Sequence, residues 1–282
     1  MSGKSGGILK RLFGGSSEPK SEDAAPGRAS RLSMAPMDPG PILTLCFSYE
    51  RGESARDVTH SDSALERTLQ LLARLKIHAT FHCPARLAET AFNQLGSIRD
   101  AGHEIACQGY RRESAAELTG NALSDTLRKC RESLSELDVT PVGFHPPGEL
   151  GEAGAYLRLA REGFRYVSAL SREDNPRLLV ETPPLVRMPI AANDSGYARH
   201  PEDPRHVLTK HLALVDRLIR KRHYLALNYH VWVLGDATER FADLEAVASR
   251  ALRAGASVRP FVTALPAPYR PASGDPAREK SA

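Results

Sequence analysis

Residues 224–232, Tyr-Leu-Ala-Leu-Asn-Tyr-His-Val-Trp, form the clearest strand-like run in this chain of 282 residues. Apolar residues recur at helical spacing before this run, at 208–220, and after it, at 241–254. A buried strand between two helices is typical of an α/β fold, because crossover helices connect parallel strands. The run therefore predicts a parallel sheet with helices packed on it.

The same alternation continues toward both ends of the chain. Further strands are predicted at 42–47, 78–83, 103–107, 142–144, 164–168, 185–189 and 256–261, and further helices at 63–75, 86–100, 114–137 and 151–163. Seven or eight repeats without a GxGxxG turn favour a (β/α) barrel over an open doubly wound sheet. Functional residues of such a barrel lie at the C-terminal ends of its strands.

The two ends of the chain differ in composition from the part between them. Residues 1–38 are rich in Gly, Ser, Pro and charge and predict a disordered leader, residues 39–266 the barrel, and residues 267–282 a disordered tail. Ile8 to Phe13 place apolar residues on one helical face beside two basic ones, which is typical of a short amphipathic anchor. A solvated tail is the alternative, because so short a helix binds a membrane weakly.

Composition limits the classes of partner and compartment. The formal net charge is only +4, and the basic residues form no long stripe, so we expect no nucleic-acid partner. The first residues lack the apolar core of a signal peptide, which predicts a cytoplasmic protein, with peripheral contact at the inner membrane face if the anchor operates. The four cysteines form no CxxC pair and are expected to be buried reduced thiols.

Five short motifs occur in a fixed order along the predicted strands. They are Ala-Thr-Phe-His-Cys at 79–83, Gly-His-Glu-Ile-Ala at 102–106, Gly-Phe-His-Pro-Pro-Gly at 143–148, Gly-Phe-Arg-Tyr at 163–166 and Leu-Asn-Tyr-His-Val-Trp at 227–232. Together they resemble the motifs of the polysaccharide deacetylase (NodB-homology) family over about residues 41–265. The resemblance implies a distorted (β/α) barrel, in agreement with the alternation of strands and helices.

The resemblance also implies a reaction and the groups that it needs. Active members hold a divalent metal such as zinc with one carboxylate and two histidines, which polarises the acyl carbonyl and acidifies a bound water. A carboxylate base takes a proton from that water, and an acid, usually histidine, protonates the leaving amine.

The first motif of the family falls on Ser48, Tyr49 and Glu50. Ser48 stands at the position of the base, and a serine without an activating partner cannot act as one. The metal-binding carboxylate falls on Tyr49 or, in a second pattern of the family, on Glu50. Glu50 is therefore either a surviving carboxylate at the ligand position or a solvated loop charge.

The second motif departs furthest from the family. Its two histidine positions fall on Gln108 and Arg112. Glutamine is a poor ligand for a transition metal, and arginine stays protonated and has no lone pair to donate. We therefore expect no metal cofactor in this chain.

The remaining positions are mixed. His145 stands where the family has the arginine that orients the base, and Val167 stands where an acidic residue is expected. His230 occupies the position of the acid, although a hydrogen-bonded core histidine would look the same. A metal site rebuilt from His78, His82 and His103 is an open alternative.

The sequence supports three functional hypotheses. The first is a deacetylase-like protein without metal-dependent activity that binds a carbohydrate or an anionic small molecule or acts in envelope polysaccharide metabolism. Arg51, Arg111 and Arg112 would make the barrel mouth positive, and Tyr110 and Trp232 would offer flat surfaces to a sugar.

The other two hypotheses assign different roles to the same barrel. One is an active cytoplasmic hydrolase that removes an N-acyl group from a sugar or a lipid-linked sugar, with His230 as its acid. The other is a scaffold or regulatory partner, suggested by the long leader. The sequence leaves the ligand, the partner and the oligomeric state open.

Overall fold

A computed structural model describes residues 37–271 except residues 53, 114–116, 147–149, 151–153, 204 and 222. The leader up to residue 36, with its proposed anchor from Ile8 to Phe13, and the tail from residue 272 lie outside the described residues. The strands are β1 Ile42–Ser48, β2 Thr80–Cys83, β3 Glu104–Cys107, β4 Gly143–Phe144, β5 Tyr166–Leu170, β6 Arg177–Val180, β7 Leu185–Ile190, β8 Ala192–Asn193, β9 Tyr224–His230 and β10 Ser257–Val258. The helices are α2 Ala55–Leu75, α3 Leu87–Thr90, α4 Phe92–Asp100, α5 Gly120–Ser135, α6 Ala155–Arg161, α7 Gly196–Arg199, α8 His206–Lys221, α9 Val231–Gly235, α10 Thr238–Arg253, α11 Phe261–Ala264 and the 3₁₀ helix Ala267–Tyr269.

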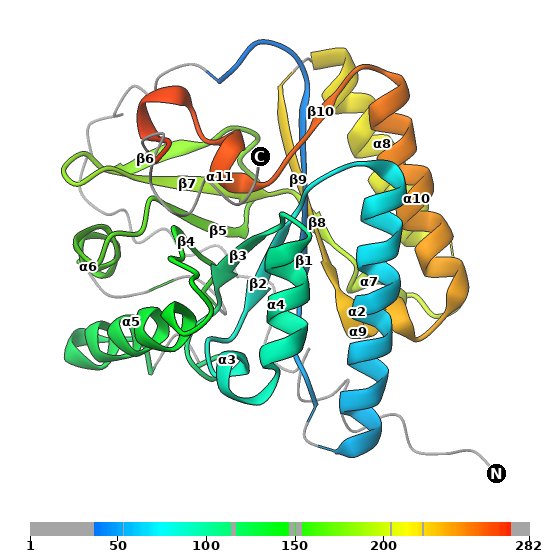
Figure 1. Ribbon diagram of the computed structural model, residues 1–282. Helices are drawn as coiled ribbons and strands as arrows, with labels where there is room; N and C mark the ends of the chain where they lie inside the picture. Colours follow the sequence, from blue (N-terminus) through cyan, green and yellow to red (C-terminus); the bar gives the residue numbers. More distant parts are fainter. Residues whose placement is uncertain are drawn as a thin grey trace.

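The strands form one curled sheet in the order β6-β7-β5-β4-β3-β2-β1-β9-β8, with β10 beside β1. Every pair is parallel except β6 with β7. Helices α8, α10, α2 and α4 lie outside the sheet along β9, β1 and β2, and α5 and α6 lie near β4 and β5 (Figure 1). The fold is the distorted (β/α) barrel that the sequence predicts.

Alternation along β1 separates two apolar cores. Ile42 and Cys46 point into the barrel, whereas Leu43, Leu45 and Phe47 point outward to the helices. Successive side chains of a strand face opposite sides, so a continuous apolar run is needed where both sides are covered. This explains why the central strands read as unbroken apolar stretches.

Helix α2 begins earlier than the apolar pattern indicates. The pattern predicts a start near Asp62 or Ser63, but the N-cap is Ser54, whose hydroxyl accepts a hydrogen bond of 3.2 Å from the Asp57 backbone N–H. Ser is a favourable N-cap, and an acidic side chain in the first turn stabilises the helix dipole. The first two turns of α2 contain few apolar residues, so the apolar periodicity does not reveal them.

Two other predicted boundaries were wrong. The strand at 224–232 ends at His230, and Val231 and Trp232 begin α9. The strand at 256–261 is only two residues long, because Pro260 precedes the short helix α11. The chain therefore turns directly after His230, which fixes this side chain at the strand end.

The N-terminal ends of the strands are closed by the C-terminal segment. The Glu104 carboxylate accepts hydrogen bonds from the Thr80 hydroxyl at 2.6 Å, the Tyr166 hydroxyl at 2.9 Å and the Val262 N–H at 3.0 Å. The Thr80 hydroxyl in turn accepts from the Phe261 N–H at 2.9 Å. Helix α11 thus plugs this end of the barrel, and the opposite end carries the candidate site.

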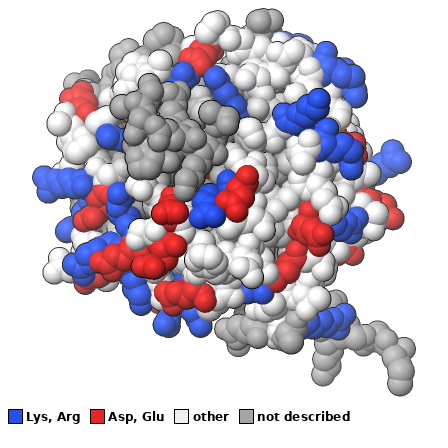
Figure 2. Space-filling view, in the orientation of Figure 1, with Lys and Arg blue, Asp and Glu red and all other residues white. Residues whose placement is uncertain are grey.

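The ordered chain extends past the predicted start of the tail at residue 267. Asp38 pairs with Arg259 at 2.8 Å and with Arg270 at 2.5 Å, so the first and last described segments are joined. On the face shown in Figure 2, Lys and Arg side chains alternate with Asp and Glu and form no single basic patch. No helix between residues 37 and 271, in its described parts, is long and apolar enough to cross a bilayer.

Candidate functional site

The C-terminal ends of β1 and β3 bring Glu50, Gln108 and Arg112 together. The Gln108 Nε2 group donates a hydrogen bond of 3.0 Å to Glu50 Oε1, and Arg112 Nη1 lies 3.0 Å from Glu50 Oε2. The Glu50 side chain is only 10% exposed. Glu50 is therefore part of the site, and both of its oxygens are bound by protein groups.

The loop after Gln108 directs Arg112 toward Glu50. The Glu113 carboxylate accepts hydrogen bonds of 2.9 Å from the backbone N–H groups of Tyr110 and Arg111. Arg112 has a φ of +69°, an uncommon conformation for a residue with a side chain, and it sits where the loop reverses. The Glu113 carboxylate thus holds the backbone of the loop, and the Arg112 side chain faces the barrel mouth, where it pairs with Glu50.

The side chains at the family's ligand positions do not fit a divalent metal. The guanidinium of Arg112 contacts one oxygen of Glu50, and Gln108 donates its amide NH₂ to the other. Across the described residues, no group of three or more His, Cys, Asp or Glu side chains could hold a metal ion. The cation that Glu50 binds in this chain is thus the guanidinium of Arg112.

The alternative ligand position, Tyr49, points away from the mouth. Its ring belongs to the outer core, and its hydroxyl donates to Asp62 at 2.7 Å. Arg51 also pairs with Asp62, at 2.6 Å, and donates to the Thr90 carbonyl. The sequence hypothesis of a positive mouth therefore loses two of its cations to pairing, since Arg51 and Arg112 each face a carboxylate.

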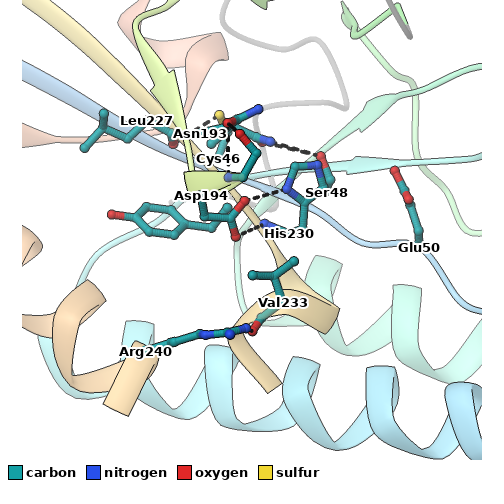
Figure 3. Close-up of polar contacts among 12 residues, drawn as sticks. Cys46, Ser48, Glu50, Asn193, Asp194, Leu227, His230, Val233 and Arg240 are labelled. Carbon is teal, nitrogen blue, oxygen red and sulfur yellow. Dashed lines mark hydrogen bonds and ion pairs between the residues drawn. The ribbon is translucent and has the colours of Figure 1, made fainter. Parts of the chain in front are cut away.

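Ser48 occupies the last position of β1 and points into the barrel. It is fully buried, and its hydroxyl lies 3.4 Å from Asn228 Oδ1 and 3.3 Å from Asn228 Nδ2. In the parallel register Ser48 lies beside His230, and Figure 3 shows both near Glu50 at the same end of the barrel. Its partner, Asn228, is an amide, which does not activate a hydroxyl by taking its proton.

His230 is held by Asp194, which follows β8. The His230 Nδ1 lies 2.6 Å from Asp194 Oδ1, and the His230 backbone N–H donates to Oδ2 at 2.8 Å (Figure 3). Burial lowers the pKa of His230, but the charge and hydrogen bond of Asp194, helped by Glu50, outweigh it and raise the pKa overall. The sequence-predicted acid is thus a carboxylate-supported imidazole, suited to carry a proton.

His145 and His82 stack on each other inside the barrel. Their ring centroids are 4.1 Å apart with an interplanar angle of 4°, and the Ser168 hydroxyl lies 3.1 Å from His82 Nε2 and 3.2 Å from His145 Nδ1. Burial, with smaller contributions from neighbouring positive charge, lowers the pKa of both rings, that of His145 to about 4. Both are therefore neutral near pH 7.

A rebuilt metal site at His78, His82 and His103 is not formed. His78 precedes β2 and is exposed, and it meets His103 edge-on with ring centroids 5.8 Å apart. His103 accepts a hydrogen bond from the Ala79 N–H and belongs to the helix side of the sheet, whereas His82 points into the barrel. This alternative, left open by the sequence, is not realised among the described residues, because His78 does not share the strand face of His82.

The two aromatic candidates have different environments. Trp232 lies in α9, with its ring centroid 6.3 Å from that of His230. Tyr110 is 7% exposed, its hydroxyl donates to Glu89, and Lys129 Nζ lies 3.8 Å from its ring centroid. Trp232 therefore lies near His230 at the site. Tyr110 is largely buried and packs against Lys129, with its hydroxyl bound to Glu89.

Sequence reasoning missed three residues of the site, namely Asp194, Ser168 and Asn228. Val167, where the resemblance expects an acidic residue, is buried in the outer core, and Asp194 supplies the carboxylate instead. Asp194 follows the apolar run of β7 and the short β8, so a search for carboxylates after every strand would have found it. Ser168 and Asn228 alternate with buried residues inside strands and carry no such signal.

Comparisons with known proteins agree with this architecture. The chain matches the sequence model of the family described as polysaccharide deacetylase over residues 44–167. A peptidoglycan deacetylase of Helicobacter pylori is 29% identical over 133 residues, which are 45% of this chain and 45% of that protein. The match thus spans less than half the length of this curated relative.

Solved structures share the fold at low identity. A Mycobacterium smegmatis protein assigned to the polysaccharide deacetylases has a TM-score of 0.65 and 22% identity, covering 80% of this chain and 91% of that one. A CE4 family pseudoenzyme of Bacillus anthracis has a TM-score of 0.54 and 15% identity, covering 80% of this chain and 66% of that one. A mutant of that pseudoenzyme has restored enzymatic activity.

Proposed function

The chain belongs to the polysaccharide deacetylase family, and we propose that it binds a carbohydrate at the barrel mouth without metal-dependent deacetylation. The observation that carries this proposal is the contact of 3.0 Å between Arg112 Nη1 and Glu50 Oε2. A guanidinium stands where relatives need an imidazole nitrogen, and it neutralises the one carboxylate left for a metal.

Electrostatics supports the exclusion of a divalent ion. Coulomb's law gives a repulsion of roughly 8 kcal/mol between charges of +1 and +2 that lie ~4 Å apart at an effective dielectric constant of ~20. An ion that displaced Arg112 would also meet the NH₂ group of Gln108, which has no lone pair to offer. The wild-type side chains therefore oppose metal binding twice.

The second missing element is the base. Ser48 replaces it, is fully buried and contacts the amide of Asn228. The described mouth thus retains a proton carrier, His230, while Ser48 stands at the position of the family's carboxylate base. A pseudoenzyme with this fold exists among the structural neighbours, which makes loss of chemistry with retention of the barrel a precedent.

Charge pairing favours a neutral ligand over an anion. Arg112 pairs with Glu50 and Arg51 pairs with Asp62, so neither carries an uncompensated charge for an anion. Trp232 beside His230 supplies an aromatic surface, and the polar groups of the mouth supply hydrogen bonds to hydroxyls. A neutral saccharide matches this combination better than a uronate or a phosphate.

The test measures metal, turnover and binding on the full chain. We expect far less than one zinc per chain by mass spectrometry, no acetate release from chitotetraose, and saturable chitotetraose binding by calorimetry. Arg112→Met weakens binding, whereas Arg128→Met on α5, a matched change of an arginine 65% exposed, leaves binding unchanged. Stoichiometric zinc that disappears in Glu50→Gln, together with acetate release, would contradict the proposal.

A second candidate function, hydrolysis of an N-acyl sugar or lipid-linked sugar, has one observation in its favour. His230 and Asp194 form a short pair, and the raised pKa of His230 suits a general acid. If the chain is a hydrolase, wild-type protein releases acetate and His230→Ala lowers the rate by about 100-fold or more. Absence of acetate release from wild-type protein removes this candidate.

A further inference from the structure

Gln108 and His145 are lateral neighbours at the ends of β3 and β4. Cys107 and Phe144 are register partners, and each candidate residue directly follows one of them. The His145 backbone N–H donates to the Cys107 carbonyl at 2.8 Å, which fixes the two strand ends together. Their side chains therefore belong to one wall of the mouth.

The tautomer of His145 follows from its hydrogen bonds. Its Nδ1 lies 2.7 Å from the Ser168 carbonyl oxygen, which only accepts, so Nδ1 carries the proton. The Nε2 of a neutral ring is then an acceptor. Among the described residues no partner reaches this Nε2, and His145 keeps partial exposure while the stacked His82 has none.

A second acceptor belongs to Gln108, the lateral neighbour of His145 in the sheet. The Gln108 NH₂ group must face Glu50, because the opposite amide orientation would set an oxygen against a carboxylate. The Gln108 Oε1 atom is then buried without a hydrogen-bond partner in the described structure. An unpaired buried acceptor is unfavourable, so a donor that reaches this wall is favoured.

We propose that His145 Nε2 is a specificity-determining hydrogen-bond acceptor that selects ligands presenting a neutral donor, a hydroxyl or amide N–H of a saccharide, at the wall formed by Gln108 and His145. This inference rests on the proposed function and adds which partner donates and which accepts in the contact between the ligand and His145. An acceptor at position 145 repels anionic oxygens and binds a hydrogen-bond donor. An arginine at the same position would donate hydrogen bonds and so would prefer anionic oxygens. Burial, with smaller contributions from His230 and Arg112, lowers the pKa of His145 to about 4, so the ring stays neutral and accepting at pH 7.

The experiment compares calorimetric affinities for chitotetraose and cellotetraose at pH 7. His145→Phe keeps a flat ring against His82 but removes the acceptor, and His145→Gln restores an acceptor on a side chain of similar reach. We expect His145→Phe to lose about tenfold in affinity and His145→Gln to stay within about threefold of wild type. Near-ultraviolet circular dichroism checks folding, and His145→Met serves as the acceptor-free variant if His145→Phe does not fold.

The outcomes separate the inference from the proposed function. A loss confined to chitotetraose assigns the donor to the acetamide N–H, and an equal loss for both sugars assigns it to a hydroxyl; both support the inference. Binding by wild type with unchanged affinity in His145→Phe overturns the inference and leaves the proposed function intact. Absence of binding of either sugar to wild type overturns both.

Discussion

Two glutamates at opposite ends of the barrel, Glu50 and Glu104, are bound in different ways. Glu50 at the C-terminal end faces a guanidinium and an amide, whereas Glu104 at the N-terminal end accepts from two hydroxyls and a backbone N–H. No cation lies among these partners of Glu104. Burial raises the pKa of Glu104, and its hydrogen bonds only partly offset this.

The difference shows what each end of the barrel does. The N-terminal end is built for closure, because its carboxylate joins three separate segments, at Thr80, Tyr166 and Val262. The C-terminal end keeps a charge pair, Arg112 with Glu50, that a ligand could contact. Changes at Glu50 should therefore alter binding, and changes at Glu104 should alter stability.

The largest effect is expected from rebuilding a metal site at the mouth. The variant Gln108→His with Arg112→His offers two imidazoles beside Glu50, a ligand set that suits zinc. Histidine tolerates the positive φ at position 112 better than most residues. We expect micromolar or tighter zinc binding by calorimetry, where wild type shows none.

The control for the rebuilt site adds Glu50→Gln to the double variant and should abolish the gained affinity. If the double variant binds no zinc while its fold is intact, the three positions do not converge as the structure has them. Zinc binding that survives Glu50→Gln would place the ion elsewhere.

The next effect is a pH dependence of opposite sign at the two ends. The folded pKa of His145, about 4, lies below the value of about 6.5 in unfolded chains, so its stabilising contribution is complete above pH 6.5 and is lost toward pH 4. This loss amounts to about 3 kcal/mol at most. Urea unfolding of His145→Gln should show a shallower decline over this window.

Glu104 acts in the other direction. Its folded pKa is raised, so its contribution is present below pH 4.5 and is lost as the pH rises through the folded value. If His145→Gln and wild type lose stability equally between pH 6.5 and pH 4, His145 is not kept neutral beside His82 in the folded protein.

A smaller effect is expected from Glu104→Gln at pH 7. The substituted NH₂ group would face one of the donors that now point at the carboxylate, which costs about 1–3 kcal/mol in the free energy of unfolding. Glu50→Gln should cost less, because its partner Arg112 is 28% exposed and solvent screens the ion pair. Urea denaturation of both variants measures the difference, and a reversed order would contradict the assignment of the two ends.

The smallest effect is the coupling energy between Arg112 and Glu50. Arg112 is 28% exposed, so solvent screens the pair and a double-mutant cycle with Arg112→Met and Glu50→Gln should give about 1 kcal/mol or less. Thermodynamic parameters from urea unfolding of the four proteins supply the cycle. A coupling of several kcal/mol would mean that the pair is a structural element of the fold.

The order of the central strands and of the long helices is predictable from the sequence alone, because the buried parallel strands are unbroken apolar runs and the helices repeat their apolar residues. The short strands β6 and β8 and the short helices α7, α9 and α11 carry no such pattern and were not predicted. It also identified Glu50, Gln108, Arg112, His145 and His230, since motifs place side chains at known strand ends. Apolar runs, helical periodicity and motifs depend on residues that are neighbours along the chain, so they can be recognised in the sequence.

Tertiary structure alone decided which of these groups meet. The pairing of Arg112 with Glu50, the support of His230 by Asp194 and the stacking of His82 on His145 join residues from different strands. The sequence could not place His78 away from His82 or Arg51 on Asp62, because such contacts depend on register and on loop conformation. Distances between side chains that are far apart in the sequence arise only when the sheet curls, so the polarity of the mouth is a property of the folded barrel.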